Sequence, residues 1–224
     1  MINKQFEADG FASIAQVLSA RECELIAART VAIDANAVGT RCLLAEDWCR
    51  ALARRLLQHP NIAAFIPSGF VAVQCIYFEK SVERNWLVPV HQDLSIPVAA
   101  RVDHPDLRGW SEKEGGLFVQ PPAALMEQLV ALRVHLDACL EQDGPLQFVP
   151  GSHQEGRISA DEARMRRQAG PIVSCAMEQG DVLAMRPLVL HASSKAEGHS
   201  RRRVLHFVFG PPKLPYGLSW QRPV

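Results

Sequence analysis

The sequence lacks an excess of charge of either sign. Its 224 residues include 24 Lys and Arg against 24 Asp and Glu, so the formal net charge at neutral pH is zero. Proteins that bind nucleic acid usually carry a basic patch or stripe, because contacts to phosphates supply much of the affinity. The sequence has no basic stripe with interleaved aromatic residues either, so we expect no nucleic acid among the partners.

Signals for export, for paired cysteines and for membrane insertion are also missing. The six cysteines contain no C-x-x-C pair, and the first ten residues lack the charged and then apolar pattern of an export signal. The one long uncharged stretch, residues 61–78, is interrupted by Pro67, Gly69 and Gln74, so it does not resemble a bilayer-spanning helix. We therefore expect a cytoplasmic protein with no membrane partner.

Apolar residues are abundant enough to build one sizeable core. They make up 48% of the chain, and a length of 224 residues fits one domain of above-average size. The chain has no evident linker, internal repeat or low-complexity segment. We predict a single domain over residues 1–224, with a helical cover over about 1–60 and a barrel core over about 69–212.

The first quarter of the chain carries helical patterns. Ser19 and Glu22 have the spacing of a capping box and are followed by apolar residues on one face, which predicts a helix over about 19–34. A second apolar pattern, at i, i+4 and i+8, predicts a helix over about 45–58, which Pro60 ends. Both helices should pack as an outer cover on another layer.

From residue 69 onward the pattern changes to short apolar stretches separated by Gly, Pro and charged clusters. The predicted strands cover residues 71–78, 87–96, 129–136, 146–149, 172–176, 181–185 and 204–209. A capping-box spacing at Ser159 and Glu162 predicts one short helix among them. Helices followed by many short strands predict a mainly β protein, a sandwich or barrel of sheets with helices on one side.

One His-x-Asp pair stands at the end of an apolar stretch. In an extended chain residues i and i+2 share a face, so His91 and Asp93 would both point inward while Gln92 points away. His191, which ends the apolar run 189–191, can supply a third ligand. Two neutral imidazoles and one carboxylate on one face of a metal form the facial triad of non-haem Fe(II) oxygenases.

A run of three arginines opens the last predicted strand. Arg202, in the middle of the run, stands eleven residues after His191. A guanidinium buried in a barrel is costly unless it is paired, and a dicarboxylate co-substrate would supply the partner. Because side chains alternate along a strand, only one or two of the three can point inward; Arg203 is the alternative to Arg202.

These motifs resemble those of the phytanoyl-CoA dioxygenase family of Fe(II)/2-oxoglutarate-dependent oxygenases. The resemblance rests on His91-Gln92-Asp93, Val149-Pro150-Gly151-Ser152-His153, His191-Ala192-Ser193 and Arg202, and on the opening Phe6-Glu7-Ala8-Asp9-Gly10-Phe11. It covers nearly the whole chain. The resemblance implies a double-stranded β-helix, which is a jelly-roll or cupin-like barrel, flanked by N-terminal α-helices.

The resemblance also assigns roles to individual residues. It places the catalytic iron on His91, Asp93 and His191. It places the distal carboxylate of the co-substrate 2-oxoglutarate on Arg202, and spacing along an extended strand puts Ser193 on the same side as the ligand His191, where it can help.

Two further residues are candidates for contacts with the co-substrate. Trp110 resembles an aromatic residue that the family places near 2-oxoglutarate, and a plain core tryptophan is the alternative. Gln74 is a candidate to contact the other end of 2-oxoglutarate. The alternative is a polar residue whose hydrogen bonds are satisfied within a strand.

The remaining histidines carry no predicted role at the iron. His153 closes the Pro-Gly-Ser-His segment, which we interpret as a structural turn. His206 alternates with valines and is interpreted as an ordinary strand residue. His135 and Arg133 lie on a polar face that is either solvated or part of the substrate pocket.

The predicted activity is a 2-oxoglutarate-dependent dioxygenase that uses Fe(II) and O2. We expect hydroxylation of an unactivated C–H bond of a small organic molecule, with release of succinate and CO2. A carboxylate ligand at Asp93 leaves no ligand position for chloride, which favours hydroxylation over halogenation, while a related desaturation stays open. The alternative is a non-catalytic metal-binding barrel that acts as a ligand-binding protein. We expect a monomer or a homodimer.

Overall fold

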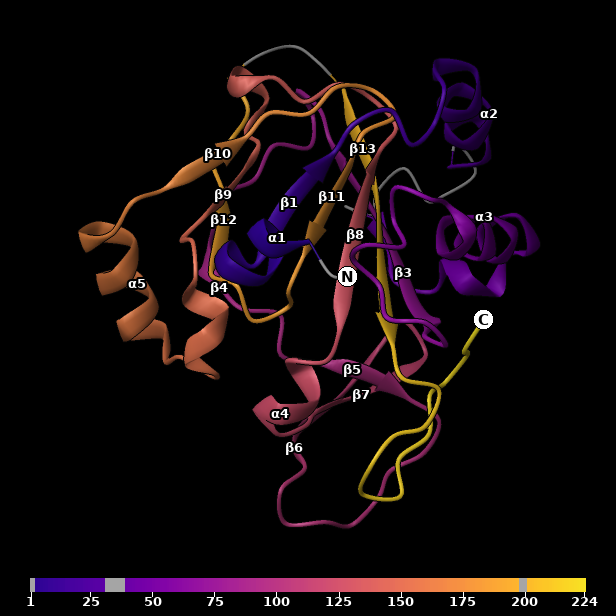
Figure 1. Ribbon diagram of the computed structural model, residues 1–224, viewed down its shortest axis with the longest axis vertical. Coiled ribbons are helices and arrows are strands. Elements are labelled where there is room, and N and C mark those ends of the chain that lie inside the picture. The colour runs from indigo at the N-terminus through magenta and orange to yellow at the C-terminus, as the bar shows by residue number, and fades with distance from the viewer. Residues whose placement is uncertain (1–2, 31–38, 198–200) are drawn as a thin grey trace.

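Two antiparallel sheets face each other in the computed structural model, which describes residues 3–30, 39–197 and 201–224 (Figure 1). The larger sheet has six strands in the order β1 (Phe11–Ile14), β11 (Val182–Met185), β8 (Val130–His135), β13 (Arg202–Gly210), β3 (Val71–Lys80) and β2 (Gly39–Thr40). The smaller sheet has four strands in the order β10 (Val173–Cys175), β9 (Leu146–Phe148), β12 (His191–Ser193) and β4 (Val88–His91). A further three-stranded sheet has the order β5 (Ile96–Val98), β7 (Gly116–Gln120) and β6 (Arg108–Lys113).

The chain passes repeatedly from one of the two facing sheets to the other. Strands β3, β8, β11 and β13 belong to the larger sheet, and β4, β9, β10 and β12 belong to the smaller one. This alternation is that of a jelly roll, or double-stranded β-helix, and it confirms the predicted mainly β fold. Within the described ranges no strand pairing joins the two sheets, so their edges stay open and the barrel is not closed.

The helices lie outside the two sheets. They are α1 (Lys4–Asp9), α2 (Ala20–Thr30), α3 (Asp47–Gln58), α4 (Ala123–Met126) and α5 (Ala160–Ala169), with short 3-10 turns η1 (Leu43–Ala45), η2 (Glu141–Asp143) and η3 (Ser152–Glu155). The helix predicted over 45–58 is confirmed as α3, and the short helix after Ser159 is α5, whose capping box is formed. Helix α2 fills the first part of the range 19–34, and residues 31–34 lie outside the described part of the chain.

Several elements of the fold differ from the prediction. The region expected to be helical contains β1, which pairs with β11 and extends the larger sheet. The stretch 87–96, expected as one strand, is divided between β4 and β5 by the segment that carries Asp93. Strands β2, β6, β7 and β12 are not among the predicted strands. Strand β6 is mostly polar and exposed, so it carries no apolar signal.

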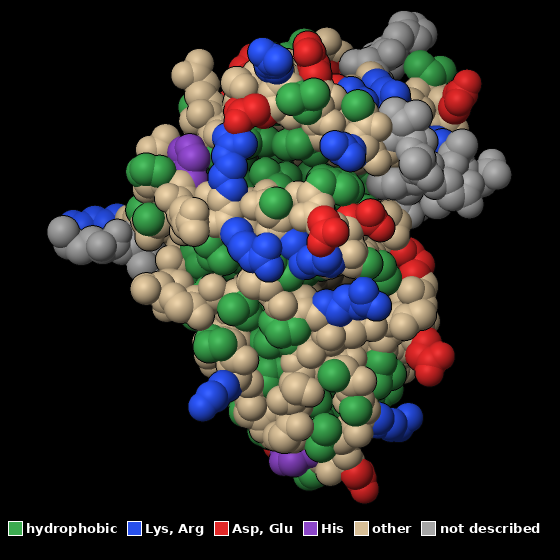
Figure 2. All heavy atoms as spheres, turned by 90° about the vertical axis from the view of Figure 1, so that its right-hand side faces the viewer, with side chains coloured by type: hydrophobic (Ala, Val, Ile, Leu, Met, Phe, Trp, Pro, Cys, Tyr) green, Lys and Arg blue, Asp and Glu red, His purple; other side chains and the backbone are tan. Residues whose placement is uncertain are grey.

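The outer face of the larger sheet is buried under α2 and α3. Leu52 and Leu56 of α3 belong to one apolar cluster with Leu205 and Phe207 of β13. Burying each such side chain contributes roughly 1.5–3 kcal/mol. Figure 2 shows this side of the molecule, where Lys and Arg side chains are interspersed with Asp and Glu. No helix in the described ranges combines the length and the apolar composition needed to cross a membrane.

The opposite, inward face of the larger sheet carries polar residues in register. On β13, Arg202 pairs with Lys80 of β3, and four residues later His206 pairs with Arg133 of β8. Val208 then pairs with Gln74. Cross-strand partners share a face of the sheet, so strand register brings these side chains to the space between the two sheets.

Candidate metal centre

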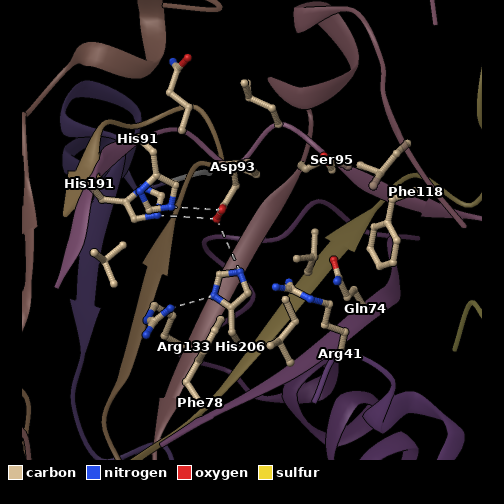
Figure 3. Close-up of a pocket in the computed structure, with 18 of the residues that line it drawn as sticks. Arg41, Gln74, Phe78, His91, Asp93, Ser95, Phe118, Arg133, His191 and His206 are labelled. Atoms are coloured by element: carbon tan, nitrogen blue, oxygen red, sulfur yellow. Dashed lines mark hydrogen bonds and ion pairs between the residues drawn. The ribbon is translucent and has the colours of Figure 1, made fainter. Parts of the chain in front are cut away.

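Three side chains converge between the two sheets (Figure 3). His91 ends β4 and is the register partner of His191, which opens β12. Asp93 follows β4, and its backbone N–H donates to the carbonyl oxygen of Pro187 at 2.9 Å. One ligand atom from each of the three lies within 4.8 Å of the others, and both Nε2 atoms lie 3.8 Å from carboxylate oxygens of Asp93.

Backbone carbonyls fix the orientation of both imidazoles. Nδ1 of His91 lies 2.8 Å from the carbonyl oxygen of Pro89, and Nδ1 of His191 lies 2.9 Å from that of Val189. A carbonyl oxygen only accepts, so Nδ1 carries the hydrogen in each ring and Nε2 keeps its lone pair. Both lone pairs therefore face the carboxylate of Asp93, which is the arrangement that a bound metal requires.

The charge states of the cluster also suit a metal. Burial lowers the pKa of His191 to about 4, so this imidazole is neutral at pH 7. Burial acts to raise the pKa of Asp93, but the imidazoles of His191, His206 and His91 hold it below its usual value. An ionised carboxylate beside neutral imidazole nitrogens is the donor set of a non-haem Fe(II) site with open positions. The residues present thus fit such a metal.

The residue between the first two ligands anchors the loop that carries Asp93. Gln92 is buried, and its amide nitrogen donates to the carbonyl oxygens of Leu188 at 2.7 Å and Gly156 at 2.8 Å. Its amide oxygen accepts from the backbone N–H of Ile158 at 2.8 Å. Three hydrogen bonds to the backbone of two other segments hold the loop in place, so Asp93 stays directed at the two histidines.

A third imidazole, that of His206, stands beside the three converging side chains. Its Nε2 lies 3.9 Å from the Asp93 carboxylate, and its Nδ1 lies 3.4 Å from Nη1 of Arg133 (Figure 3). Burial and the charge of Arg133 lower the pKa of His206 to about 3, so its Nδ1 can accept a hydrogen bond from the guanidinium. The sequence interpretation missed this contact, although His206 stands four residues from Arg202 and so shares its face of the strand.

Two buried cations, Lys80 and Arg202, lie side by side on the inward face of the larger sheet, where β3 ends and β13 begins. The ammonium of Lys80 donates to Oγ of Ser193 at 2.6 Å and to the carbonyl oxygen of Ser194 at 2.5 Å. Arg202, its register partner, donates to the carbonyl oxygen of Gly144. No described carboxylate lies within 4 Å of either cation. Burial and the charge of Arg202 lower the pKa of Lys80 to about 8. The sequence analysis did not single out Lys80.

The structure distinguishes Arg202 from its neighbour Arg203. Arg202 is buried and lines the cavity beside the histidines. Arg203 points to the other face of β13, where its Nε and Nη2 donate to the two carboxylate oxygens of Asp137 at 2.8 and 2.7 Å. A guanidinium that already holds a bidentate carboxylate has little capacity for another anion.

Of three other residues considered in the sequence analysis, Gln74 lines the cavity, whereas Trp110 and His153 do not. Gln74 is buried and lines the cavity, whereas Trp110 lies on β6 outside the cavity lining, with its ring against the guanidinium of Arg101. The tryptophan that lines the cavity is instead Trp86. His153 lies apart from the cluster, with its Nε2 at 3.2 Å from a backbone carbonyl of α1.

A cavity of about 430 Å³ surrounds these groups. Its walls come from both facing sheets and from β7, and they include the aromatic side chains of Phe78, Trp86 and Phe118. Figure 3 shows the three ligand candidates and His206 directed at one another inside it. Apolar walls around a few convergent polar groups are typical of a small-molecule site.

Solved structures of other proteins share this fold. The structure of HygX from Streptomyces hygroscopicus with nickel and 2-oxoglutarate bound is 19% identical, covers 94% of this chain and 87% of its own, and has a TM-score of 0.64. SnoK, a non-haem α-ketoglutarate-dependent carbocyclase from nogalamycin biosynthesis, is 15% identical over 93% of this chain and 82% of its own, with a TM-score of 0.68. These likenesses show the jelly-roll fold.

A jelly roll that holds a His-x-Asp pair and a distant histidine around one point is the arrangement of the Fe(II)/2-oxoglutarate-dependent dioxygenases. Residues 6–204 match the phytanoyl-CoA dioxygenase family, and the chain belongs to this family. The dioxygenase cnsJ of Penicillium expansum is 37% identical over 83 residues. That match spans 35% of this chain and only 23% of the relative's length.

Proposed function

We propose that this protein is an Fe(II)- and 2-oxoglutarate-dependent dioxygenase that hydroxylates an unactivated C–H bond of a small organic molecule. In this proposal His91, Asp93 and His191 hold the iron, and Arg202 with Ser193 binds the distal carboxylate of 2-oxoglutarate. The observation that carries the proposal is the convergence of three ligand atoms within 4.8 Å of one another, beside buried cations that no described carboxylate neutralises.

The residues of the chain prepare the site for this chemistry. The carbonyl oxygens of Pro89 and Val189 hold the Nδ1 hydrogens of the two histidines, so that the Nε2 lone pairs are available to the metal. Lys80 and Arg202 attract the far end of a dicarboxylate, which directs its keto acid end toward the ligands; Gln74, on the cavity wall, is our candidate to contact that end. When bound, the metal with 2-oxoglutarate and O2 supplies the oxidation and releases succinate and CO2.

The hydroxylation outcome rests on the ligand set rather than on the fold. Neighbours with this fold include a carbocyclase, SnoK, and an epimerase, SnoN, so the fold by itself does not select the reaction. A carboxylate at Asp93 occupies the ligand position that a halide would need, which supports oxygen transfer to the substrate. The structure of HygX with nickel, 2-oxoglutarate and hygromycin B bound supports a small molecule as the substrate.

The test is an anaerobic titration of the protein with Fe(II) and then 2-oxoglutarate, followed by O2 in the presence of a panel of small organic molecules. We expect uptake of one iron per chain, substrate-dependent release of succinate, and a product heavier by one oxygen. Uptake of iron and 2-oxoglutarate with no succinate from any compound would favour the non-catalytic ligand-binding protein. A product lighter by two hydrogens would replace hydroxylation with desaturation.

A further inference from the structure

The cavity around the proposed iron site is rich in positive charge. The cationic side chains that line it are Arg41, Lys113, Arg133 and Arg202. Among the described lining residues, Asp93 is the one carboxylate. A divalent metal, Asp93, the 2-oxoglutarate dianion and Arg202 together carry no net charge, and Lys80 beside Arg202 adds one positive charge. The occupied site would therefore leave the other three cations of the lining without compensation from these groups.

Two of the remaining cations already have partners at the mouth of the cavity. The Arg41 side chain is 38% exposed, and its Nε lies 3.8 Å from a carboxylate oxygen of Glu114. The Lys113 ammonium lies 5.5 Å from the ring centroid of Phe118 and is solvated, as the exposure of Lys113 shows. Water and these neighbours screen both charges. Arg133 is different, because it is 8% exposed and lies on the inner wall.

Arg133 has few partners for its five hydrogen-bond donors. Its Nη1 lies 3.4 Å from Nδ1 of His206, and its guanidinium carbon lies 5.3 Å from the ring centroid of Phe78. Among the described residues its Nε has no hydrogen-bond partner, and none of their carboxylates lies within 4 Å of the guanidinium. Burial and the charge of Arg202 lower its pKa to about 10, so the group remains a cation at neutral pH.

Unsatisfied polar atoms concentrate at this wall. In the described part of the chain four buried side-chain nitrogen or oxygen atoms lack a hydrogen-bond partner, and three of them belong to Arg133 and His135. These two residues are two positions apart on β8 and so share its inward face. Buried polar groups in folded proteins are almost always hydrogen-bonded, and a buried guanidinium without an acceptor is costly. The described residues therefore supply no anionic acceptor for the polar groups of this wall.

We propose that Arg133 binds an oxyanion group, a carboxylate or a phosphate, on the primary substrate. This inference rests on the proposed dioxygenase function and adds the chemical class of its substrate. The planar fork of a guanidinium matches the two oxygens of such a group. Only the His206 ring separates Arg133 from the Asp93 carboxylate, so the C–H bond to be oxidised lies a short distance from the anionic group (Figure 3).

The test uses the protein loaded with Ni(II) and 2-oxoglutarate, because nickel occupies such sites and keeps the substrate probes intact. The probes are matched pairs of a carboxylate and its primary amide, from butyrate and butyramide to 3-phenylpropionate and 3-phenylpropionamide. A second arm uses ethyl phosphate and 2-phenylethyl phosphate. Calorimetric titrations compare the wild type with Arg133→Met, which keeps side-chain length without charge, with Arg133→Lys, and with Arg41→Met at the cavity mouth.

We expect anionic probes to bind the wild type more tightly than their amides, and the arm that binds better identifies carboxylate or phosphate as the group. Arg133→Met should weaken anion binding roughly 10- to 100-fold, as the loss of a charge-assisted hydrogen bond does, and should leave amide binding unchanged. The affinity of Arg133→Lys for anions should lie between those of the wild type and Arg133→Met. Arg41→Met should keep the preference for anions over amides.

Four results would overturn the proposal. The first is equal binding of anions and amides by the wild type. The second and third are a preference for anions that survives in Arg133→Met, or one that is lost in Arg41→Met instead. The fourth is a loss of 2-oxoglutarate binding in Arg133→Met, which would assign Arg133 to the co-substrate. If the wild type binds no nickel or 2-oxoglutarate at all, the proposed function fails first. The titration with 2-oxoglutarate on the same sample separates that case from the others.

Discussion

His91 and His191 are direct cross-strand partners, and their ring centroids lie 4.2 Å apart although 100 residues separate them in the chain. The pairing of β4 with β12 therefore builds the centre of the site. A shift of one residue in this register would turn one of the two imidazoles to the other face of the sheet. The site thus depends on the correct pairing of two short strands.

Replacement of Asp93 by alanine should remove metal binding. The carboxylate supplies the negative charge of the cluster, so we expect a larger loss of iron affinity than the roughly 10- to 100-fold that follows from losing an outer partner of a ligand. Succinate formation should disappear with it. Fluorescence or calorimetric titration with Fe(II) under anaerobic conditions measures the effect. His153→Ala, in a residue outside the cluster, should bind iron as the wild type does; unchanged iron uptake by Asp93→Ala would refute the assignment.

Replacement of Arg202 by methionine should weaken 2-oxoglutarate binding and leave iron binding intact. Loss of a charge-assisted hydrogen bond of roughly 1.5–3 kcal/mol corresponds to a rise of about 10- to 100-fold in the dissociation constant of 2-oxoglutarate. Titration of the nickel-loaded protein measures it. Arg203→Met is the matched comparison, because Arg203 holds Asp137 on the other face of β13 and should not affect the co-substrate. The opposite result would place Arg203 in the site.

The imidazole of His206 should act as a positioning group for Asp93. Its Nε2 faces the carboxylate at 3.9 Å and is held from the other side by Arg133, so His206→Leu should lower metal affinity by about 10- to 100-fold. His206→Gln carries an amide N–H that can replace the one on Nε2, and it should restore most of the affinity. Equal metal binding by His206→Leu and the wild type would leave this residue with a packing role alone.

Binding of 2-oxoglutarate should weaken as the pH rises above about 8. Burial lowers the pKa of Lys80 from 10.5 to about 8, so the ammonium that attracts the dicarboxylate is lost above this pH. Titrations of the nickel-loaded protein between pH 7 and 9.5 should show the dissociation constant rising, with a midpoint moved above 8 by the bound anion. Lys80→Met should bind weakly and show a flatter profile; a profile as steep as that of the wild type would assign the effect to another group.

Without ligand, the contribution of Lys80 to the stability of the protein should rise, not fall, as the pH increases above about 8. Between pH 8 and 10.5 the unfolded chain keeps the Lys80 proton that the folded chain has lost. The unfolded state then binds more protons, so the contribution of Lys80 to the free energy of unfolding rises with pH. Urea unfolding of the wild type and Lys80→Met at pH 8 and 10 isolates this contribution.

Local sequence patterns could predict the elements in which neighbours in the chain decide the structure. The capping box at Ser159 and the i, i+4, i+8 pattern of α3 involve contacts within one or two helical turns, and both helices form as predicted. Strand β6 could not be found this way, because its residues are largely exposed and polar and only its pairing with β7 makes it a strand.

The sequence by itself determined the family, the jelly-roll class and the His-x-Asp spacing, because these depend on short motifs and on the order of apolar stretches. Only the tertiary structure decided that Arg133 and His206 line the same cavity as the predicted ligands and that Trp110 does not. It also placed Lys80 beside Arg202 and against Ser193. The physical reason is that each side chain's direction depends on strand register and bulges. Register is set by pairing between segments far apart in the chain, which no local pattern encodes.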